Sequence, residues 1–249
     1  MRIQEGFLLV CFTLCSVLYA QGLDTNEVIR QIDSLDSFGN EDFTAEYTIV
    51  SDKPEEERSV TKVRFFRRDR EDKFLILIVD PLLRRGQGYL SVDDTAWSYD
   101  PESREFSIFN LSDNFEDTES RNSDFAETSL VDDYEADSYE EAMLGKYPVY
   151  VLDLKAVTDT VTFPRIRYWV RKDNYLPLKE ENYSLSDRLV RTVYYPTYGR
   201  YGDYFIPTKI LQVDNLSPGE QSEITVRGVS FNSIPDTVFT QSYLEQVNR

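Results

Sequence analysis

The sequence predicts a mainly β protein built around a single antiparallel sheet that is strongly curved or closed into a barrel. About eleven runs of residues alternate apolar and polar side chains with a period of two, and short turns join them. One helical segment precedes these runs, and one long acidic segment interrupts them. A chain of 249 residues is long enough for one large β domain or two small ones. Because no internal repeat or linker divides it, we expect residues 21–249 to form one domain.

Residues 1–20 have the pattern of an export signal. Arg2 provides a positive start, residues 7–18 are mostly apolar, and Ala20 is a plausible cleavage position. The apolar run is short compared with the roughly 20 residues that a membrane-spanning helix needs. An uncleaved anchor and a lipid-modified cysteine at Cys11 or Cys15 are the alternatives. Cleavage after Ala20 would leave an exported protein without cysteine, so its stability would depend on packing and hydrogen bonds.

The first element expected in the mature chain is a helix over residues 23–38. Asp24 is a suitable N-cap, and Glu27 follows at the position of a capping-box partner. Apolar residues recur with helical spacing along one face, which predicts that this face covers the sheet. They are Val28, Ile29, Ile32 and Leu35.

The strands are expected on both sides of the acidic segment. The run 74–79 is apolar at every position, so it is covered on both faces, or one face lines an apolar space that holds something other than protein. After residue 230 a short closing helix is expected near residues 238–247. The expected strands lie near residues 43–49, 63–68, 74–79, 89–92, 97–106, 147–154, 166–170, 176–183, 189–198, 204–213 and 224–229.

The acidic segment, residues 112–141, contains twelve acidic residues and one basic residue, Arg121. It is either a solvated, partly disordered loop or a mobile flap that docks Phe125 and its neighbours over an opening. An acidic run such as residues 132–135 could hold Ca²⁺ weakly, but it lacks the spaced ligands and glycine of a dedicated calcium loop. We predict no metal site.

Composition excludes several function classes. The formal net charge is −18, from 45 acidic and 27 basic residues, so the protein repels nucleic acid and anionic headgroups. The chain has no histidine, which removes His-dependent triads and His-ligated zinc. Ser123 has no neighbouring base to activate it. We therefore predict no catalytic residues, no cofactor and no enzymatic activity.

One ordered set of residues runs through most of the chain. It consists of Pro81, Gly86, Gly88, Tyr89, Leu90, Trp97, Tyr99, Pro101, Arg104, Ser123, Asp124, Phe125 and Asp132, then Trp169, Val170, Pro177, Lys179, Tyr183, Ile206, Pro207, Thr208, Phe239, Thr240, Tyr243 and Leu244. This set resembles the outer membrane lipoprotein-sorting protein family, the LolA-like group. The resemblance implies an incomplete β-barrel of about eleven strands, with helices and loops as a lid over a hydrophobic cavity. It also implies a periplasmic protein that binds acyl chains of lipoproteins or other lipids and moves them toward the outer membrane.

A carrier of this kind needs a water-free slot, in which each buried CH₂ contributes roughly 0.8 kcal/mol, and a lid over it. The resemblance implies a rim arginine that bonds to the lid, and four arginines compete for that role. The lid and rim candidates are Arg84, Arg85, Arg104, Arg121 and Phe125. The cavity candidates are Phe43, Tyr47, Phe65, Phe74, Ile76, Ile78, Leu90, Trp97 and Tyr99.

Two binding functions remain open at this point. The first is a monomeric carrier, with acylated lipoprotein or lipid as cargo, an inner-membrane transporter that loads it and an outer-membrane acceptor as possible partners. The second is an envelope sensor or assembly partner that uses the same fold without carrying cargo. In that case the acidic segment, with Asp132, Asp133 and Glu135, would contact a basic partner.

Overall fold

The computed structural model describes residues 23–93 and 95–247, which contain thirteen strands, all in one antiparallel sheet. The mainly β fold class is therefore confirmed, while the expected number of about eleven strands was too low. The predicted signal peptide, with Ala20 and both cysteines, lies outside the described residues.

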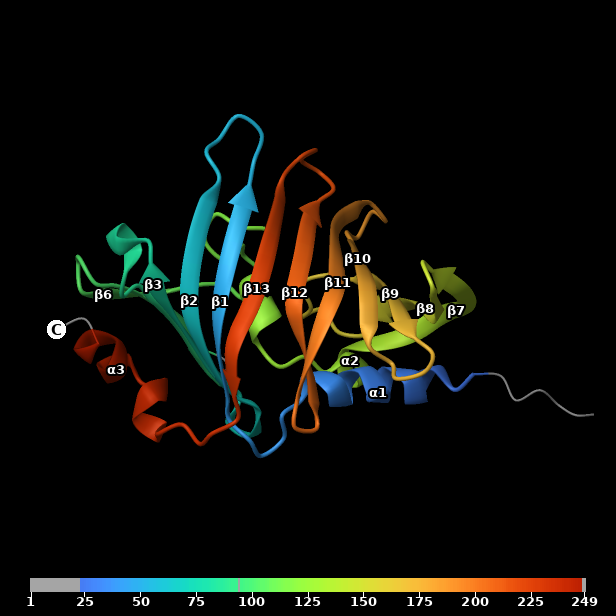
Figure 1. The fold of residues 1–249 in the computed structure, drawn as a ribbon, viewed down its shortest axis with the longest axis horizontal. Helices are drawn as coiled ribbons and strands as arrows, with labels where there is room; N and C mark the ends of the chain where they lie inside the picture. The colour runs from blue at the N-terminus through green and yellow to red at the C-terminus, as the bar shows by residue number, and fades with distance from the viewer. Residues whose placement is uncertain (1–22, 94, 248–249) are drawn as a thin grey trace, which may run out of the picture.

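The sheet is not closed into a barrel, because its two edge strands, β6 and β7, do not pair with each other in the described part of the chain. Figure 1 shows these strands at opposite ends of the molecule. From edge to edge the order is β6 (Glu105–Ile108), β5 (Thr95–Asp100), β4 (Gly88–Val92), β3 (Lys73–Asp80), β2 (Ser59–Arg68), β1 (Phe43–Asp52), β13 (Gln221–Ser230), β12 (Tyr204–Asp214), β11 (Leu189–Tyr201), β10 (Pro177–Tyr183), β9 (Arg165–Arg171), β8 (Tyr147–Ala156) and β7 (Tyr134–Leu144).

The path of the chain gives the sheet two different faces. The chain enters at the central strand β1, reaches the β6 edge, and then crosses one face to the β7 edge before it returns to β13 beside β1. We call the crossed face the inner face and residues 109–129 the cover segment. The inner face also carries α1 (Thr25–Asp36) and α2 (Leu130–Asp133), and a C-terminal segment lies against the opposite, outer face.

Helix α1 begins where its N-cap was expected. The side chain of Asp24 accepts a hydrogen bond from the backbone N–H of Glu27, at 3.1 Å. The Glu27 side chain does not close a capping box, because it accepts hydrogen bonds from Arg30 and Gln31 instead. The apolar face of α1 packs on β8 and β9, so the helix covers the sheet as predicted. This cluster joins Val28, Ile29 and Ile32 to Leu152, Leu154 and Ile166.

Strand β3 is buried on both faces by protein. Phe74, Ile76 and Ile78 point to the inner face, where they share one core cluster with Phe115 and Phe125 of the cover segment. Leu75 and Leu77 point to the outer face and pack with the C-terminal segment. The uninterrupted apolar run of β3 thus reflects two protein covers and no exposed slot.

The acidic residues 112–141 do not form a single flap. The cover segment contains a 3-10 turn, Asn122–Phe125, that buries Phe125 against Phe65, with ring centroids 5.5 Å apart. From Tyr134 onward the chain is strand β7, paired with β8 along its length. Most β7 side chains are exposed because only one side of this edge strand has a neighbour. Because many of the solvent-exposed β7 side chains are acidic, the apolar–polar alternation that marks a strand was hidden in the sequence.

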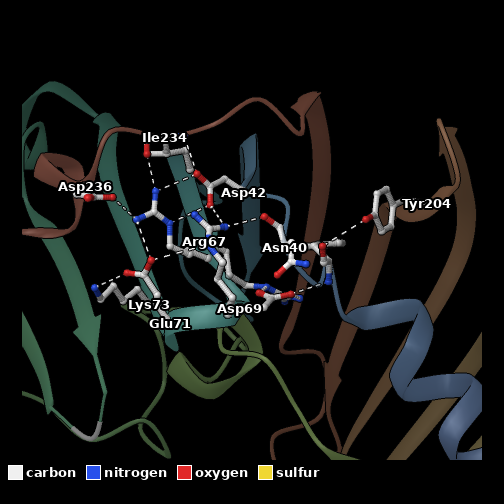
Figure 2. A network of polar contacts seen from close by, with 12 residues as sticks. Asn40, Asp42, Arg67, Asp69, Glu71, Lys73, Tyr204, Ile234 and Asp236 are labelled. Carbon is white, nitrogen blue, oxygen red and sulfur yellow. Dashed lines mark hydrogen bonds and ion pairs between the residues drawn. The ribbon is translucent and has the colours of Figure 1, made fainter.

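The outer face of β2–β5 is covered by the C-terminal segment. A 3-10 turn, Asp236–Phe239, precedes α3 (Gln241–Gln246), so the expected closing helix forms in two short pieces. An ionic network attaches this segment to the end of β2, because Arg68 binds both Asp42 and Asp236. Figure 2 shows Asp42, Ile234 and Asp236 gathered at this place. The apolar side chains that meet on this face are Phe66, Leu75, Leu77, Leu90, Tyr99, Ile234, Val238, Phe239 and Leu244.

We expect Gly88→Ala to lower the free energy of unfolding by about 1–3 kcal/mol. A Cβ atom at Gly88 would overlap the side chain of Leu244, which is fully buried and has little space to move. Denaturant unfolding monitored by circular dichroism measures the change. In a Leu244→Ala background, Gly88→Ala should lower the free energy of unfolding much less. Equal losses of stability in both backgrounds would contradict the steric explanation.

Candidate functional site

A cavity of about 730 Å³ lies between the inner face of the sheet and its covers. This volume is within the range of small-molecule sites, roughly 300–1,000 Å³. The covers are α1, α2, the cover segment and residues 159–163. The apolar and aromatic side chains that line the cavity are Ile32, Leu35, Phe38, Phe43, Tyr47, Phe65, Leu111, Phe125, Leu130, Tyr134, Val161, Phe163, Ile166, Tyr168, Leu176, Val193, Tyr195, Tyr198, Phe205, Ile206, Ile210 and Ile224.

A partly buried ion pair attaches the cover segment to the sheet. The guanidinium of Arg191 on β11 donates two hydrogen bonds to the carboxylate of Asp124, at 2.6 and 3.0 Å. Its third nitrogen, Nε, donates to Asn182 at 2.9 Å, and its carbon lies 4.9 Å from the ring centre of Phe163. Burial opposes the charge of Arg191, but Asp124 outweighs it and raises the pKa of Arg191 above its ordinary range. The Arg191 guanidinium therefore stays charged, and its two hydrogen bonds to Asp124 hold the cover segment over the cavity.

The Asp124 carboxylate has further partners that define the local turn. It accepts hydrogen bonds from Gln212 Nε2 on β12 at 3.1 Å and from the backbone N–H of Arg121 at 2.8 Å. Two strands of the sheet and the cover segment thus meet at one side chain.

A second ionic contact holds the end of α1 beside the cavity. Arg67 on β2 donates through Nε to Asp69 at 2.7 Å and lies 4.4 Å from the ring centre of Phe38 (Figure 2). It also binds the backbone carbonyl of Asp36 and lies 3.5 Å from the Asp36 carboxylate. Burial raises the pKa of Asp36, and Arg67 only partly opposes this effect.

The two helical covers are joined to each other by Asp33. Its carboxylate accepts hydrogen bonds from the backbone N–H groups of Leu130 and Val131, each at 2.9 Å. These are the first N–H groups of α2, which have no partner inside the helix. Helices α1 and α2 therefore form one unit over the β8–β9 side of the cavity.

A buried polar group lies on the sheet side of the cavity. Glu180 on β10 accepts hydrogen bonds from the hydroxyl of Tyr195 at 2.9 Å and from Asn182. Burial, followed by the nearby charge of Glu180, raises the pKa of both Tyr168 and Tyr195 well above the usual range. Both phenols remain neutral and present hydrogen-bonding groups within a largely apolar wall.

The structure separates the nine cavity candidates into three groups. Phe43, Tyr47 and Phe65 line the cavity. The second group, Phe74, Ile76 and Ile78, lies on the inner face, but these side chains are covered by Phe115 and Phe125 and do not reach the cavity. The third group is on the wrong face, because Leu90, Trp97 and Tyr99 point outward and pack with the C-terminal segment. The alternation places Leu90, Trp97 and Tyr99 on a common face but does not indicate what covers it.

The lid and rim candidates are also scattered. Phe125 lines the cavity from the cover segment. Arg84 binds Thr61 at 2.7 Å and Glu116, and so attaches the β3–β4 loop to the cover segment. Arg85 binds the carbonyl of Val79, Arg104 lies in the β5–β6 turn with a φ of 61°, and Arg121 binds Asn114. None of these four arginines lines the cavity among the described residues.

Sequence reasoning missed Arg191, which lines the cavity and binds the cover segment. One signal was available, because the alternation in β11 places Arg191 on the same face as Val193 and Tyr195. A charged residue at an inward position of a strand requires a partner.

No helix in residues 23–93 and 95–247 has the length and apolar character that would allow it to cross a bilayer.

Comparison with known proteins places the chain in a family and assigns its fold. A family model described as "Uncharacterized protein" matches residues 70–246. No curated protein sequence matches the chain. Three solved structures each superimpose with a TM-score of 0.77.

The first of these structures is a LolA superfamily protein from Nitrosomonas europaea, 23% identical, with 89% of this chain and 100% of that chain covered. The second is a putative outer membrane lipoprotein-sorting protein domain from Vibrio parahaemolyticus, 20% identical, with coverage of 87% and 97%. The third is a DUF1329 family protein from Desulfovibrio piger, 19% identical, with coverage of 88% and 97%. The resemblance to the LolA-like group is thereby confirmed. The chain belongs to the family whose model matches residues 70–246, and it has the LolA-like fold.

Proposed function

We propose that this protein is an exported, periplasmic carrier that binds the acyl chains of lipoproteins or other lipids in the covered cavity and moves them toward the outer membrane. The observation that carries the proposal is the cavity itself, which has a mostly apolar lining and a cover that both packs on the sheet through Phe125 and is bonded to it through Asp124. Each CH₂ of an acyl chain buried there contributes roughly 0.8 kcal/mol. The proposed cargo residues are therefore the cavity-lining set, including Phe43, Tyr47, Phe65 and Phe125.

The cover supports release as well as binding. Arg191–Asp124 and Arg67–Asp36 hold the cover segment and α1 by ionic contacts that can break and re-form, whereas a fully apolar seal would not reopen easily. Cargo that fills the cavity competes with these contacts for space. The inner-membrane transporter that loads cargo and the outer-membrane acceptor belong to this proposal as expected partners.

A binding function agrees with the local chemistry better than catalysis does. The nearest side-chain partner of Ser123 is the hydroxyl of Thr162 at 3.2 Å, which is not a base. The second candidate function, a non-carrying sensor or assembly partner, would use the acidic side chains of β7 and the preceding turn.

The first experiment is native mass spectrometry with lipid extraction on mature protein purified from a membrane-rich lysate. Carriage predicts co-purifying lipid or acylated protein. A folded protein that is empty and takes up no added lipid contradicts the carrier proposal and favours the sensor, which pull-downs with Asp132, Asp133 and Glu135 variants would then test.

Ile210→Gln tests the cavity directly. Ile210 lines the cavity, and a buried amide without a partner costs about 1–3 kcal/mol, so lipid affinity should fall roughly 5- to 150-fold. Titration with a neutral acyl ligand measures the loss. The matched control is Leu211→Gln on the same strand, because Leu211 does not line the cavity. Equal losses in the two variants would place the acyl chain elsewhere.

A further inference from the structure

The charged residues around the cavity are strongly unbalanced in sign. Among the described lining residues, every charged side chain supplied by the covers is a carboxylate. We call these six residues the acidic rim. They come from α1, the cover segment, α2 and the 159–163 loop, and they are Asp33, Asp36, Asp124, Glu127, Asp133 and Asp159.

The sheet side does not supply a free positive charge. Arg67 and Arg191 are the cations among the described lining residues, and each already binds a carboxylate. Arg67 is held by Asp69 and Asp36, and Arg191 is held by Asp124. Glu180 adds one further carboxylate on this side. An anionic group that entered the cavity would therefore meet several carboxylates and no unpaired cation.

The rim carboxylates are close enough to affect one another. Burial raises the pKa of Asp33, and the nearby charges of Asp36 and Asp132 raise it further. Burial also raises the pKa of Glu127, with contributions from Asp69 and Asp36. The covers therefore carry like charges around the cavity, where a positive group would be attracted and a negative group repelled.

We propose that the cavity selects acyl cargo whose polar end carries no net negative charge, such as a neutral or basic acylated peptide end or a zwitterionic phospholipid. This inference rests on the proposed function and specifies its substrate class. Apolar contacts hold the acyl chain, and the acidic rim discriminates between the groups attached to it. Fatty-acid carboxylates and anionic phospholipids are the classes that the rim rejects.

The test uses three palmitoylated dipeptide amides that share one acyl chain and differ in one side chain. Palmitoyl-Gly-Lys-amide is cationic, palmitoyl-Gly-Ser-amide is neutral and palmitoyl-Gly-Glu-amide is anionic. Competition of all three for the protein, measured by native mass spectrometry at about 10 mM ionic strength, should give the order Lys, Ser, Glu. We expect the cationic ligand to bind at least about tenfold more tightly than the anionic one, and the ratio to shrink as salt is added.

A pair of double variants separates the rim from overall charge. Glu127→Gln with Asp159→Asn removes two rim charges from exposed cover positions. The affinity for the Lys ligand relative to the Glu ligand should then fall severalfold. Glu56→Gln with Glu57→Gln removes two charges from the exposed β1–β2 turn, which does not line the cavity, and should leave the ratio unchanged. Equal effects of the two variants would overturn the role of the rim.

The remaining outcomes distinguish this inference from the carrier proposal. If all three ligands bind with equal affinity, the selection inference fails and the carrier proposal stands. If none binds, both fail. A parallel competition between phosphatidylethanolamine and phosphatidylglycerol with identical acyl chains separates the two cargo sources. If the protein prefers phosphatidylethanolamine to phosphatidylglycerol and the neutral peptide to the anionic one, the inference holds for both lipids and acylated peptides. Preference for phosphatidylglycerol overturns it.

Discussion

Replacing Asp42 with asparagine is expected to lower the free energy of unfolding by about 3–5 kcal/mol, the largest single loss that we predict. The carboxylate accepts hydrogen bonds from Arg68 Nε at 2.9 Å, Arg68 Nη2 at 3.0 Å, Arg70 Nη1 at 2.6 Å and the backbone N–H of Ile234 at 2.6 Å. Asp42 and Arg68 are 2% and 1% exposed, so the substitution leaves a buried guanidinium without its counter-charge.

The loss should appear as release of the C-terminal segment as well as lower stability. Arg68 also binds Asp236 at 2.6 Å and lies 4.9 Å from the ring centre of Phe239, so it joins β2 to residues far along the chain. Urea unfolding gives the free energy. Asp52→Asn is the matched control, because Asp52 ends strand β1, which Asp42 precedes, and its solvent-exposed pair with Arg58 should contribute only about 0–1 kcal/mol. Similar losses in the two variants would contradict the role assigned to the buried network.

The Asp42 carboxylate should also make the free energy of unfolding fall at acidic pH. Burial tends to raise the pKa of Asp42, but hydrogen bonds from Arg68, the Ile234 amide and Arg70 outweigh burial and hold it well below the usual range. Because the folded pKa is below the unfolded value of about 3.9, the contribution is complete above roughly pH 4 and is lost as the pH falls toward the folded pKa. The Asp42→Asn variant should therefore show a flatter loss of stability below pH 4 than the wild type.

Replacing Asp124 with asparagine is expected to loosen the cover segment by about 2 kcal/mol, which corresponds to roughly thirtyfold faster amide exchange in residues 110–128. The substitution breaks the two-point contact with Arg191 and leaves that 5%-exposed guanidinium side chain without its partner. Hydrogen–deuterium exchange with mass spectrometry, under conditions in which exchange follows the opening equilibrium, measures the change.

The control for this experiment lies in the same segment. Asp117 pairs with Lys53 at the surface, with 71% of its side chain exposed, so Asp117→Asn should change exchange by less than about threefold. If Asp124→Asn leaves exchange at the control level, Arg191 does not hold the cover closed. In that case the apolar contacts of Phe125 would be sufficient to hold it.

Local patterns in the sequence predicted most of the elements, because each pattern depends on residues a few positions apart. The cap at Asp24, the apolar face of α1 and the alternating strands all appear in the structure. There are two exceptions among the strands. The expected strand 97–106 is divided into β5 and β6, and β7 was missed because acidic residues on an edge hid the alternation. A solvent-exposed edge strand lacks the apolar side chains that usually mark a strand in the sequence.

The candidate site was predicted less well than the fold. Phe43, Tyr47 and Phe65 were correctly placed on one face, because they occupy alternate positions in paired strands. Leu90 and Trp97 satisfy the same rule equally well, but they pair with each other on the outer face. Alternation defines two faces and does not identify which one encloses a cavity.

Local patterns and composition were enough to predict the fold class, the positions of most strands, the capped helix and the acidic character of the chain. Tertiary contacts alone show which face is covered, that Phe125 packs on Phe65, and that Arg191 is the cation that binds Asp124. The reason is separation along the chain. Arg191 and Asp124 are 67 positions apart, and Arg68 and Asp236 are 168 apart, so their contacts exist only after the strands have paired in register.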